Sequence, residues 1–378
     1  MTQAFFGERL RLARLLNLMP QADLAATVGV TRQYIHALEI GDKTPTQDLI
    51  LALSLPLNVA PGFFSKPSDT EVKEEQCHFR SRKTTLLAHR QQFIAHGTLF
   101  NALIRQLDEK LALPKVNIPH VDISNARDVD DAIEDAAVQA RQHWNLGEGP
   151  ITNMCRVLEK KAGAVITRFA GISEKVDALS VSAARPIVVQ NPEERSPARM
   201  RFSLAHECGH LVTHFGVETG DEITEAQADR FAGAFLLPRR TFTLDFPQGG
   251  RFEWGKLYQM KKTWGVSVSA ILRRAKDLGL INDTQYSSGN AYLSKTGQKK
   301  KELYDDLVEK ESPTLLRTAL GVYDKDRVRK GAITETLQIS ANMLRRLVGE
   351  DASTAEGGTG DGAVVNIGEF RGKRQSSK

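Results

Sequence analysis

Residues 199–214, RMRFSLAHECGHLVTH, contain a His-Glu-x-x-His pattern within an expected helix. His206 and His210 are four positions apart, so they project from one helix face, about 6 Å apart along the axis. Two imidazoles at this spacing can bind one zinc ion. Glu207 lies between them and can act as a general base toward water. The pattern also arises by chance, so the neighbouring sequence has to support it.

A second expected helix supplies the carboxylates that such a site needs. Residues 225–238 read EAQADRFAGAFLLP, with Glu225 at the start and Asp229 one turn later on the same face. A carboxylate from a second helix completes a His₂Glu site and leaves one position for water. Asp229 could then accept the other N–H of a ligand imidazole. This arrangement is typical of gluzincins, and residues 216–224 would form the turn between the helices.

Short β-strands are expected before the His-Glu-x-x-His helix, in GAVITRFA (163–170) and VDALSVSAARPIVVQN (176–191), with a turn at residues 184–186. Together with the two motifs, this region resembles the ImmA/IrrE family of metallopeptidases over roughly residues 150–280. The resemblance implies that His206, His210 and Glu225 bind zinc and that Glu207 is the catalytic base. It also implies cleavage of a protein substrate, often a transcriptional repressor, in a stress or mobile-element response.

Two further side chains in the motif are assigned structural roles. Cys208 stands where the family often has an apolar residue, and we expect it to point away from the metal as a buried thiol. His214 extends the histidine row, but three histidines on one straight helix cannot converge on one ion, so we expect a helix-end residue. The group that stabilises the oxyanion is not identified, and a peptidase fold that has lost its activity stays open as an alternative.

The N-terminal residues have the pattern of a helix-turn-helix. Helices are expected over residues 7–16, from Pro20 to Gly29, and over residues 32–39 with Thr31 as the N-cap. Apolar residues are spaced to pack two short helices across a tight turn: Leu24, Ala25, Val28, Val30, Ile35 and Leu38.

The stretch LAATVGVTRQYIHALEIGDKTP (24–45) resembles the Cro/repressor-type (XRE) family over about residues 5–65. The resemblance implies a double-stranded DNA operator as partner and puts five residues on the groove-facing side, Thr31, Arg32, Gln33, Tyr34 and Ala37. Arg32 could read guanine and Gln33 adenine, while Thr31 or Lys43 contacts phosphate. The alternative is a helical bundle for protein contact. Residues 1–65 carry five basic and five acidic side chains, so a homodimer would help this neutral module to bind.

Composition places the chain among globular proteins of a reducing compartment. Its 378 residues are 41% hydrophobic and 26% charged, and no apolar run approaches the roughly 20 residues needed to span a bilayer. Three widely spaced cysteines imply no disulfide framework, and the N-terminus lacks a signal-peptide pattern. We therefore expect a cytoplasmic protein without a membrane partner.

The net charge of +5 is unevenly distributed. Residues 122–148 are acidic and are expected to form a solvated helix surface. Residues 239–301 contain thirteen basic and four acidic side chains, and aromatic residues such as Phe252, Trp254 and Trp264 are interleaved with them. This segment is interpreted either as a contact surface for nucleic acid or an acidic partner, with Lys261, Lys262, Arg273 and Arg274 at its centre, or as a solvated helix face.

The predicted fold is mainly α. A five-helix helix-turn-helix bundle (1–65) and a helical linker region (66–149) precede an α+β gluzincin-like metallopeptidase core with a small sheet (150–284). A helical region (285–350) and a disordered tail (351–378) follow. The predicted function is a DNA-binding transcriptional regulator with a zinc-dependent endopeptidase domain. The alternatives are a regulator whose second domain only senses a ligand or partner, and a toxin–antitoxin or phage-defence component.

Overall fold

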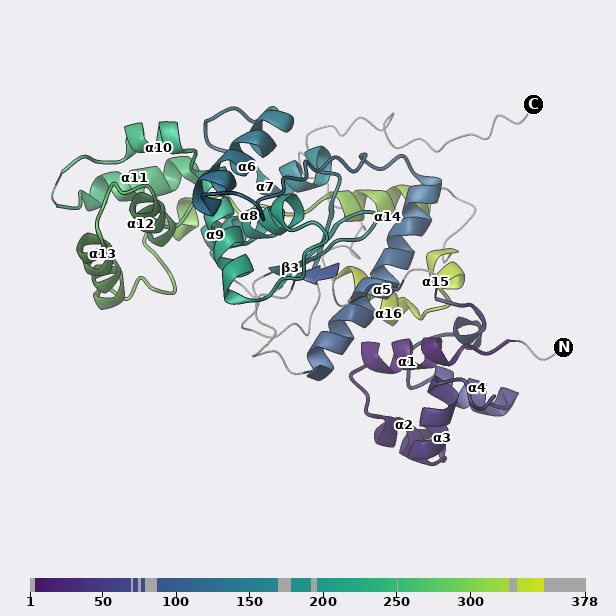
Figure 1. Ribbon diagram of the computed structural model, residues 1–378. Coiled ribbons are helices and arrows are strands. Elements are labelled where there is room, and N and C mark those ends of the chain that lie inside the picture. Colours follow the sequence, from purple (N-terminus) through teal and green to yellow (C-terminus); the bar gives the residue numbers. More distant parts are fainter. Residues whose placement is uncertain are drawn as a thin grey trace, which may run out of the picture.

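The computed structural model describes residues 4–68, 71–73, 76–78, 87–168, 178–191, 196–249, 251–325 and 332–349. These ranges form a mainly helical molecule around a small sheet, which confirms the predicted fold class (Figure 1). Within them, no helix combines the length and the hydropathy that crossing a bilayer requires. The predicted tail, residues 351–378, lies outside the described ranges, and the predicted domain boundaries stay predictions.

The N-terminal module contains the helices α1 (Gly7–Leu16), α2 (Gln21–Val28), α3 (Arg32–Glu39) and α4 (Gln47–Ser54). Gly29 ends α2 with a φ of +72°, which glycine adopts without strain. Thr31 caps α3 by accepting a hydrogen bond from the backbone N–H of Tyr34. The buried Glu39 in α3 pairs with Arg14 in α1 through two contacts. The predicted fifth helix is instead a 3₁₀ segment, η1 (Pro61–Ser65), in which proline and glycine disfavour a longer helix.

The sheet has the strand order β1-β3-β4-β2 in the described part of the chain. Strands β2 (Val165–Arg168) and β4 (Ile187–Gln190) are parallel, and β3 (Ala178–Val181) is antiparallel to β4. These three strands were predicted from the sequence. The fourth, β1 (Cys77–His78), pairs antiparallel with β3 and lies in a segment predicted as linker. Two residues are too few to leave an alternating pattern that sequence reasoning could detect.

The sheet separates two hydrophobic cores, because successive side chains of a strand point to opposite faces. Val165, Ile187 and Val189 pack into a core shared with the N-terminal module. Ile166 and Val188 pack into a second core, which contains the His-Glu-x-x-His helix.

Helix α5 (Leu87–Lys110) joins the N-terminal module to the sheet (Figure 1). It contacts α1 on one side, and Gly97 lies against Val181 of β3 on the other. The apolar side chains that the sequence places at helical spacing in this region, such as Leu99, Leu103 and Leu107, are buried. The predicted linker region is therefore partly core structure.

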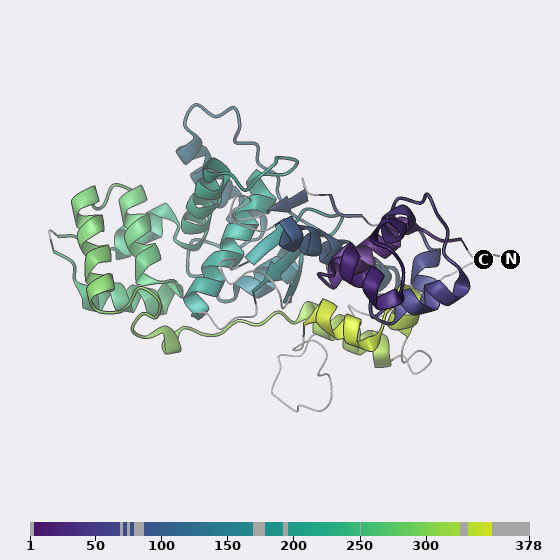
Figure 2. The ribbon, with the colours of Figure 1, turned by 90° about the horizontal axis from the view of Figure 1, so that it is seen from below.

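The C-terminal helices α14 (Leu315–Lys325), α15 (Ala332–Leu337) and α16 (Ala341–Val348) pack against α5. Of these, α15 and α16 lie beside the N-terminal helices in both views (Figure 1, Figure 2). The backbone N–H of Ala60 donates to the carbonyl of Gln338 at 2.8 Å. The Arg346 guanidinium donates to the carbonyl of Leu16 at 3.1 Å and to Oδ1 of Asn17 at 3.0 Å. These contacts fix the end of the described chain to the helix-turn-helix module.

The second core is built from the helices between the N-terminal and C-terminal regions. They are α6 (Val129–His143), α7 (Met154–Arg156), η3 (Val157–Lys161), α8 (Pro197–Thr213), α9 (Glu222–Leu236), α10 (Arg239–Asp245), α11 (Trp254–Trp264), α12 (Val268–Asp277) and α13 (Asp283–Lys295). A short 3₁₀ segment, η4 (Asp305–Leu307), follows outside this core. Helix α9 begins three residues before the predicted start, because Asp221 caps it by accepting from the N–H groups of Ile223 and Thr224.

The predicted basic surface in residues 239–301 is wrong for two of its four central residues. Lys261 is completely buried, with Nζ 2.9 Å from Glu302 and 2.6 Å from Asp305. Arg274 is buried and paired with Glu134 of α6. Burial of these two cations removes them from any contact surface.

The acidic and basic segments pair with each other across the fold. Asp131 lies 2.9 Å from Arg239, and Glu148 lies 2.7 Å from Arg240. These partners are about a hundred residues apart in sequence, so a count of charges along the chain does not reveal them. The local positive excess is therefore partly neutralised within the molecule.

Candidate metal centre

The two motif helices form a close hairpin. Ser196 caps α8 by accepting from the N–H of Arg199, and Pro197 occupies its first turn, where no backbone donor is needed. Gly209 allows α9 to approach, because a Cβ at this position would lie 3.1 Å from the ring of Phe231. The hairpin brings Glu225, in the first turn of α9, opposite the two histidines of α8.

Three side chains converge in this hairpin. The Nε2 atoms of His206 and His210 are 3.1 Å apart, and each lies 3.3 Å from a carboxylate oxygen of Glu225. Tetrahedral zinc with ligand bonds of about 2.0–2.1 Å requires separations of about 3.3–3.4 Å between ligand atoms. The geometry thus fits a single small cation bound by the three residues.

The Glu225 carboxylate fits a cation site for a second reason. Both of its oxygens are buried, and neither has a hydrogen-bond partner among the described residues. Leaving a carboxylate buried without donors is costly unless a positive charge compensates it. Two imidazoles and one carboxylate form one of the donor sets that hold zinc in catalytic sites.

Each imidazole is oriented through its other ring nitrogen. Nδ1 of His206 lies 2.7 Å from Oδ1 of Asp229. Nδ1 of His210 lies 3.0 Å from Nδ1 of His214, whose Nε2 lies 2.9 Å from Oε1 of Gln227. If Nε2 of His210 binds a cation, its Nδ1–H donates to His214, and the Nε2–H of His214 donates to Gln227. His214 is thus placed behind the cation site rather than in it.

The charges of the three converging groups are strongly perturbed. Burial alone would raise the pKa of Glu225, but the contacts with His206 and His210 lower it to about 2. Burial would lower the pKa of His206, yet Asp229 and Glu225 raise it to about 9. Burial lowers the pKa of His210 to about 4. One ionised carboxylate therefore faces one neutral and one readily protonated imidazole, and a cation would replace the proton of His206.

Glu207 is buried beside this group and contacts the sheet. Its Oε2 accepts a hydrogen bond of 2.6 Å from the hydroxyl of Ser180 in β3. Ser180 is fully buried and was not among the predicted site residues. No local sequence signal marks it, because the contact depends on how β3 packs against α8.

Cys208 occupies the position expected for a buried thiol. It belongs to the second hydrophobic core, and burial raises the pKa of the thiol. It is not part of the group of side chains that could hold a metal.

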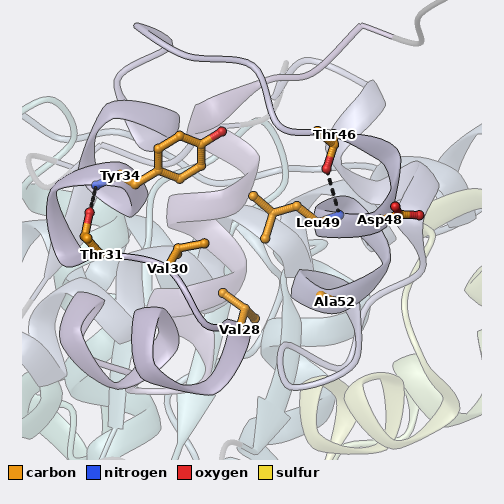
Figure 3. A pocket seen from close by; sticks show the side chains of 8 residues that line it. All are labelled: Val28, Val30, Thr31, Tyr34, Thr46, Asp48, Leu49 and Ala52. Atoms are coloured by element: carbon orange, nitrogen blue, oxygen red, sulfur yellow. Dashed lines mark hydrogen bonds between the residues drawn. The ribbon is translucent and has the colours of Figure 1, made fainter.

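The predicted DNA-contacting residues lie at and near α3. Arg32 and Gln33 are exposed, and Ala37 is half-buried. Nζ of Lys43 lies 5.0 Å from the centre of the half-buried Tyr34 ring. The Thr31 hydroxyl already accepts the capping bond of α3, which Figure 3 shows beside the matching cap of Thr46 on Leu49.

A pocket separates these two capped helix starts. Its lining residues are Val28, Val30, Thr31, Tyr34, Thr46, Asp48, Leu49 and Ala52. Apolar residues that line the pocket pack against the first hydrophobic core, whereas the hairpin of α8 and α9 belongs to the second.

Comparison with known families agrees with the two motifs. Residues 10–64 match a helix-turn-helix family, and residues 159–276 match the IrrE N-terminal-like domain of the Peptidase M78 family. No curated protein matches the chain. The chain therefore joins a helix-turn-helix domain of the XRE type to a metallopeptidase-type domain of the IrrE N-terminal-like family.

Proposed function

We propose that this protein is a DNA-binding transcriptional regulator whose second domain is a zinc-dependent endopeptidase. The observation that carries the proposal is the convergence of His206, His210 and Glu225, whose ligand atoms are 3.1–3.3 Å apart. The buried oxygens of Glu225 have no hydrogen-bond partner among the described residues. By the resemblance to ImmA/IrrE proteins, its target is another protein, often a transcriptional repressor, and its setting is a cytoplasmic stress or mobile-element response.

In this proposal, His206, His210 and Glu225 hold the zinc ion and Glu207 is the general base. Zinc, when bound, supplies Lewis-acid chemistry that polarises a peptide carbonyl and makes water more acidic. Glu207 takes a proton from the attacking water while the water oxygen forms a bond to the carbonyl carbon. It then passes this proton to the amide nitrogen as the C–N bond breaks, which releases an amine and a carboxylic acid. The acid then gives up its proton, so the final products are an ammonium and a carboxylate.

The surrounding residues serve as positioning groups. Asp229 orients the His206 ring through Nδ1, and His214 with Gln227 does the same for His210. The Ser180 hydroxyl holds the carboxylate of Glu207 in one orientation. A base kept in place before the reaction needs no reorganisation during proton transfer.

The same proposal assigns operator binding to the N-terminal module. Helix α3 presents Arg32 and Gln33 to solvent, as insertion into the major groove requires. Because the module carries no net positive charge, we propose that it binds DNA as a homodimer.

Metal content tests the proposal with a matched pair of variants on α9. Wild-type protein purified without chelator should contain one zinc per chain by elemental mass spectrometry. Glu225→Gln should lose it, whereas Glu222→Gln, the same change at an exposed position of the first turn, should keep it. Glu207→Gln should also keep it, because Glu207 is not one of the proposed ligands.

Two outcomes would favour other functions. Protein without stoichiometric zinc that still binds its operator would favour a regulator whose second domain only senses a ligand or partner. Full zinc content in Glu225→Gln would show that the metal is held elsewhere.

A further inference from the structure

Strand β1 covers one edge of the sheet. In the order β1-β3-β4-β2, removal of Cys77–His78 would leave β3 as the outer strand, with one side of its backbone unpaired. Such an edge is a ready template for an added strand. The covering residues come from about a hundred positions earlier in the chain than β3.

The covered edge borders the proposed base. Ser180 of β3 donates its hydroxyl proton to Glu207, and β3 as a whole packs against α8. The backbone register places His78 opposite Ser180 and Cys77 opposite Val181. Of the residues in β1, His78 is therefore the one paired with the strand position that contacts Glu207.

The covering segment is held by backbone and polar contacts and by the side chains of Val72 and Cys77, which are buried in the core shared with the N-terminal module. The N–H of Ser182 donates to the carbonyl of Gln76 at 2.8 Å, and Nε2 of Gln76 donates to the carbonyl of Ser182 at 2.9 Å. The buried N–H of Val72 donates to the hydroxyl of Thr98 in α5 at 3.0 Å. Cys77 is fully buried.

An extended peptide is commonly recognised by adding a strand to a sheet edge, where main-chain hydrogen bonds provide affinity. A peptide bound in this way along β3 would pass the Ser180–Glu207 contact. The only strand at that place in the described part of the chain is β1.

We propose that residues 76–78 occupy the strand position of an extended substrate peptide, so that the chain inhibits its own peptidase domain. The inference rests on the proposed peptidase function. Peptides gain access to β3 only when this segment is displaced.

The connections of the segment suggest what could displace it. On its N-terminal side, the N–H of Ser68 donates to Oε1 of Glu8 in α1 at 2.7 Å. The same segment is attached to α5 at Val72 and to the sheet at Gln76. A shift of the helix-turn-helix module relative to α5 would therefore pull on the strand that covers β3.

The test uses full-length protein and two substitutions of His78. Proline lacks a backbone N–H and fits poorly in a strand ladder, so His78→Pro should displace the segment, whereas His78→Ala keeps the backbone donor. Gln76→Glu is a milder variant, because it retains the acceptor for Lys73 but loses the donor to Ser182. Hydrogen exchange of the Ser182 amide reports displacement directly.

The binding probe is a fluorescent synthetic peptide with the sequence of residues 71–78, EVKEEQCH, followed by anisotropy. His78→Pro should bind it at least about tenfold more tightly than His78→Ala. The reason is that the state with an uncovered β3 edge, which binds the peptide, is no longer the less populated one. Gln76→Glu should show the same change in a weaker form. All these measurements are independent of zinc and of cleavage, so they remain informative if the peptidase proposal fails.

Three results would overturn the inference. The first is faster exchange at Ser182 without a gain in peptide binding, and the second is unchanged exchange in both His78→Pro and Gln76→Glu. The third is Glu207-dependent cutting of the chain within residues 71–78, which would make the segment a substrate rather than an inhibitor.

Discussion

Asp229 acts on the proposed metal centre through His206 and not through the ion. Its carboxylate meets Nδ1 of His206 at 2.7 Å and is 45% exposed, so its removal leaves no cavity in the core. The contact fixes which nitrogen carries the proton and how the ring is turned.

We therefore expect Asp229→Ala to weaken zinc binding by about 10–100-fold with little change in stability. Competition with a chromophoric chelator measures the affinity, and urea unfolding measures the stability. Glu222→Gln on the same helix serves as the control and should match the wild type. A zinc affinity of Asp229→Ala equal to that of the wild type would contradict the role of Asp229 in orienting His206.

His96 gives the molecule a pH dependence that is separate from the metal centre. It is buried in α5 and stacks on Phe100. Burial lowers the pKa of His96 to about 3, whereas an ordinary histidine titrates near 6.5. Below pH 6.5 the unfolded chain takes up a proton that the folded chain does not, so stability falls as the pH drops toward 3.

The thermal unfolding midpoint of the wild type should accordingly fall between pH 7 and pH 4.5 by more than that of His96→Gln, which cannot titrate. His36→Gln changes an exposed histidine and should behave like the wild type. Equal losses in the wild type and His96→Gln would assign the acid sensitivity to other groups.

At the residue scale, regular spacing made the proposed ligands predictable. His206 and His210 lie four positions apart on one helix, and Glu225 and Asp229 repeat that spacing on the next. Ser180 and Gln227 were not predictable, because their contacts depend on how β3 and α9 pack against α8.

Helices α6 and α12 are joined by a buried ion pair. Both guanidinium NH₂ groups of Arg274 contact the carboxylate of Glu134, and its Nε donates to the carbonyl of Leu237. Arg274 is 1% exposed, so loss of the carboxylate would leave a buried cation without its counter-charge. The pair of Arg240 and Glu148, in contrast, lies at the surface, with side chains that are 78% and 50% exposed.

Glu134→Ala should therefore cost about 3–5 kcal/mol of unfolding free energy, the usual effect of breaking a buried pair. Glu148→Ala, a matched loss of the acidic partner in the exposed pair, should cost less than about 1 kcal/mol. Urea unfolding of both variants provides the comparison. Similar costs for the two substitutions would contradict the burial of Arg274.

At the element scale, caps and periodicity located most helices and three strands. The sequence marks these helix ends locally: Gly29 ends α2, Thr31 caps α3 and Pro197 begins α8. Strand β1 and the buried state of Lys261 escaped prediction, because both depend on partners far away in sequence.

At the scale of the whole molecule, the sheet lies between the two hydrophobic cores. One face carries the core of the helix-turn-helix module with α5, and the other carries the metal-site hairpin. Arg346 and α5 tie the N-terminal helices to the rest of the chain, so the two family-matched regions share one packed structure. Family resemblance predicted both regions, but their connection through the C-terminal helices was not predictable from local patterns.

Glu207-dependent cleavage tests the central claim most directly. Zinc-loaded wild type and His78→Pro, each with and without Glu207→Gln, are incubated with casein as an unstructured protein, and the fragments are identified by mass spectrometry. The account predicts fragments from His78→Pro, fewer from the wild type, and none from either protein with Glu207→Gln, although all four hold one zinc. Equal cleavage with Glu207→Gln, or no cleavage by zinc-loaded His78→Pro with an exposed β3 edge, would contradict it.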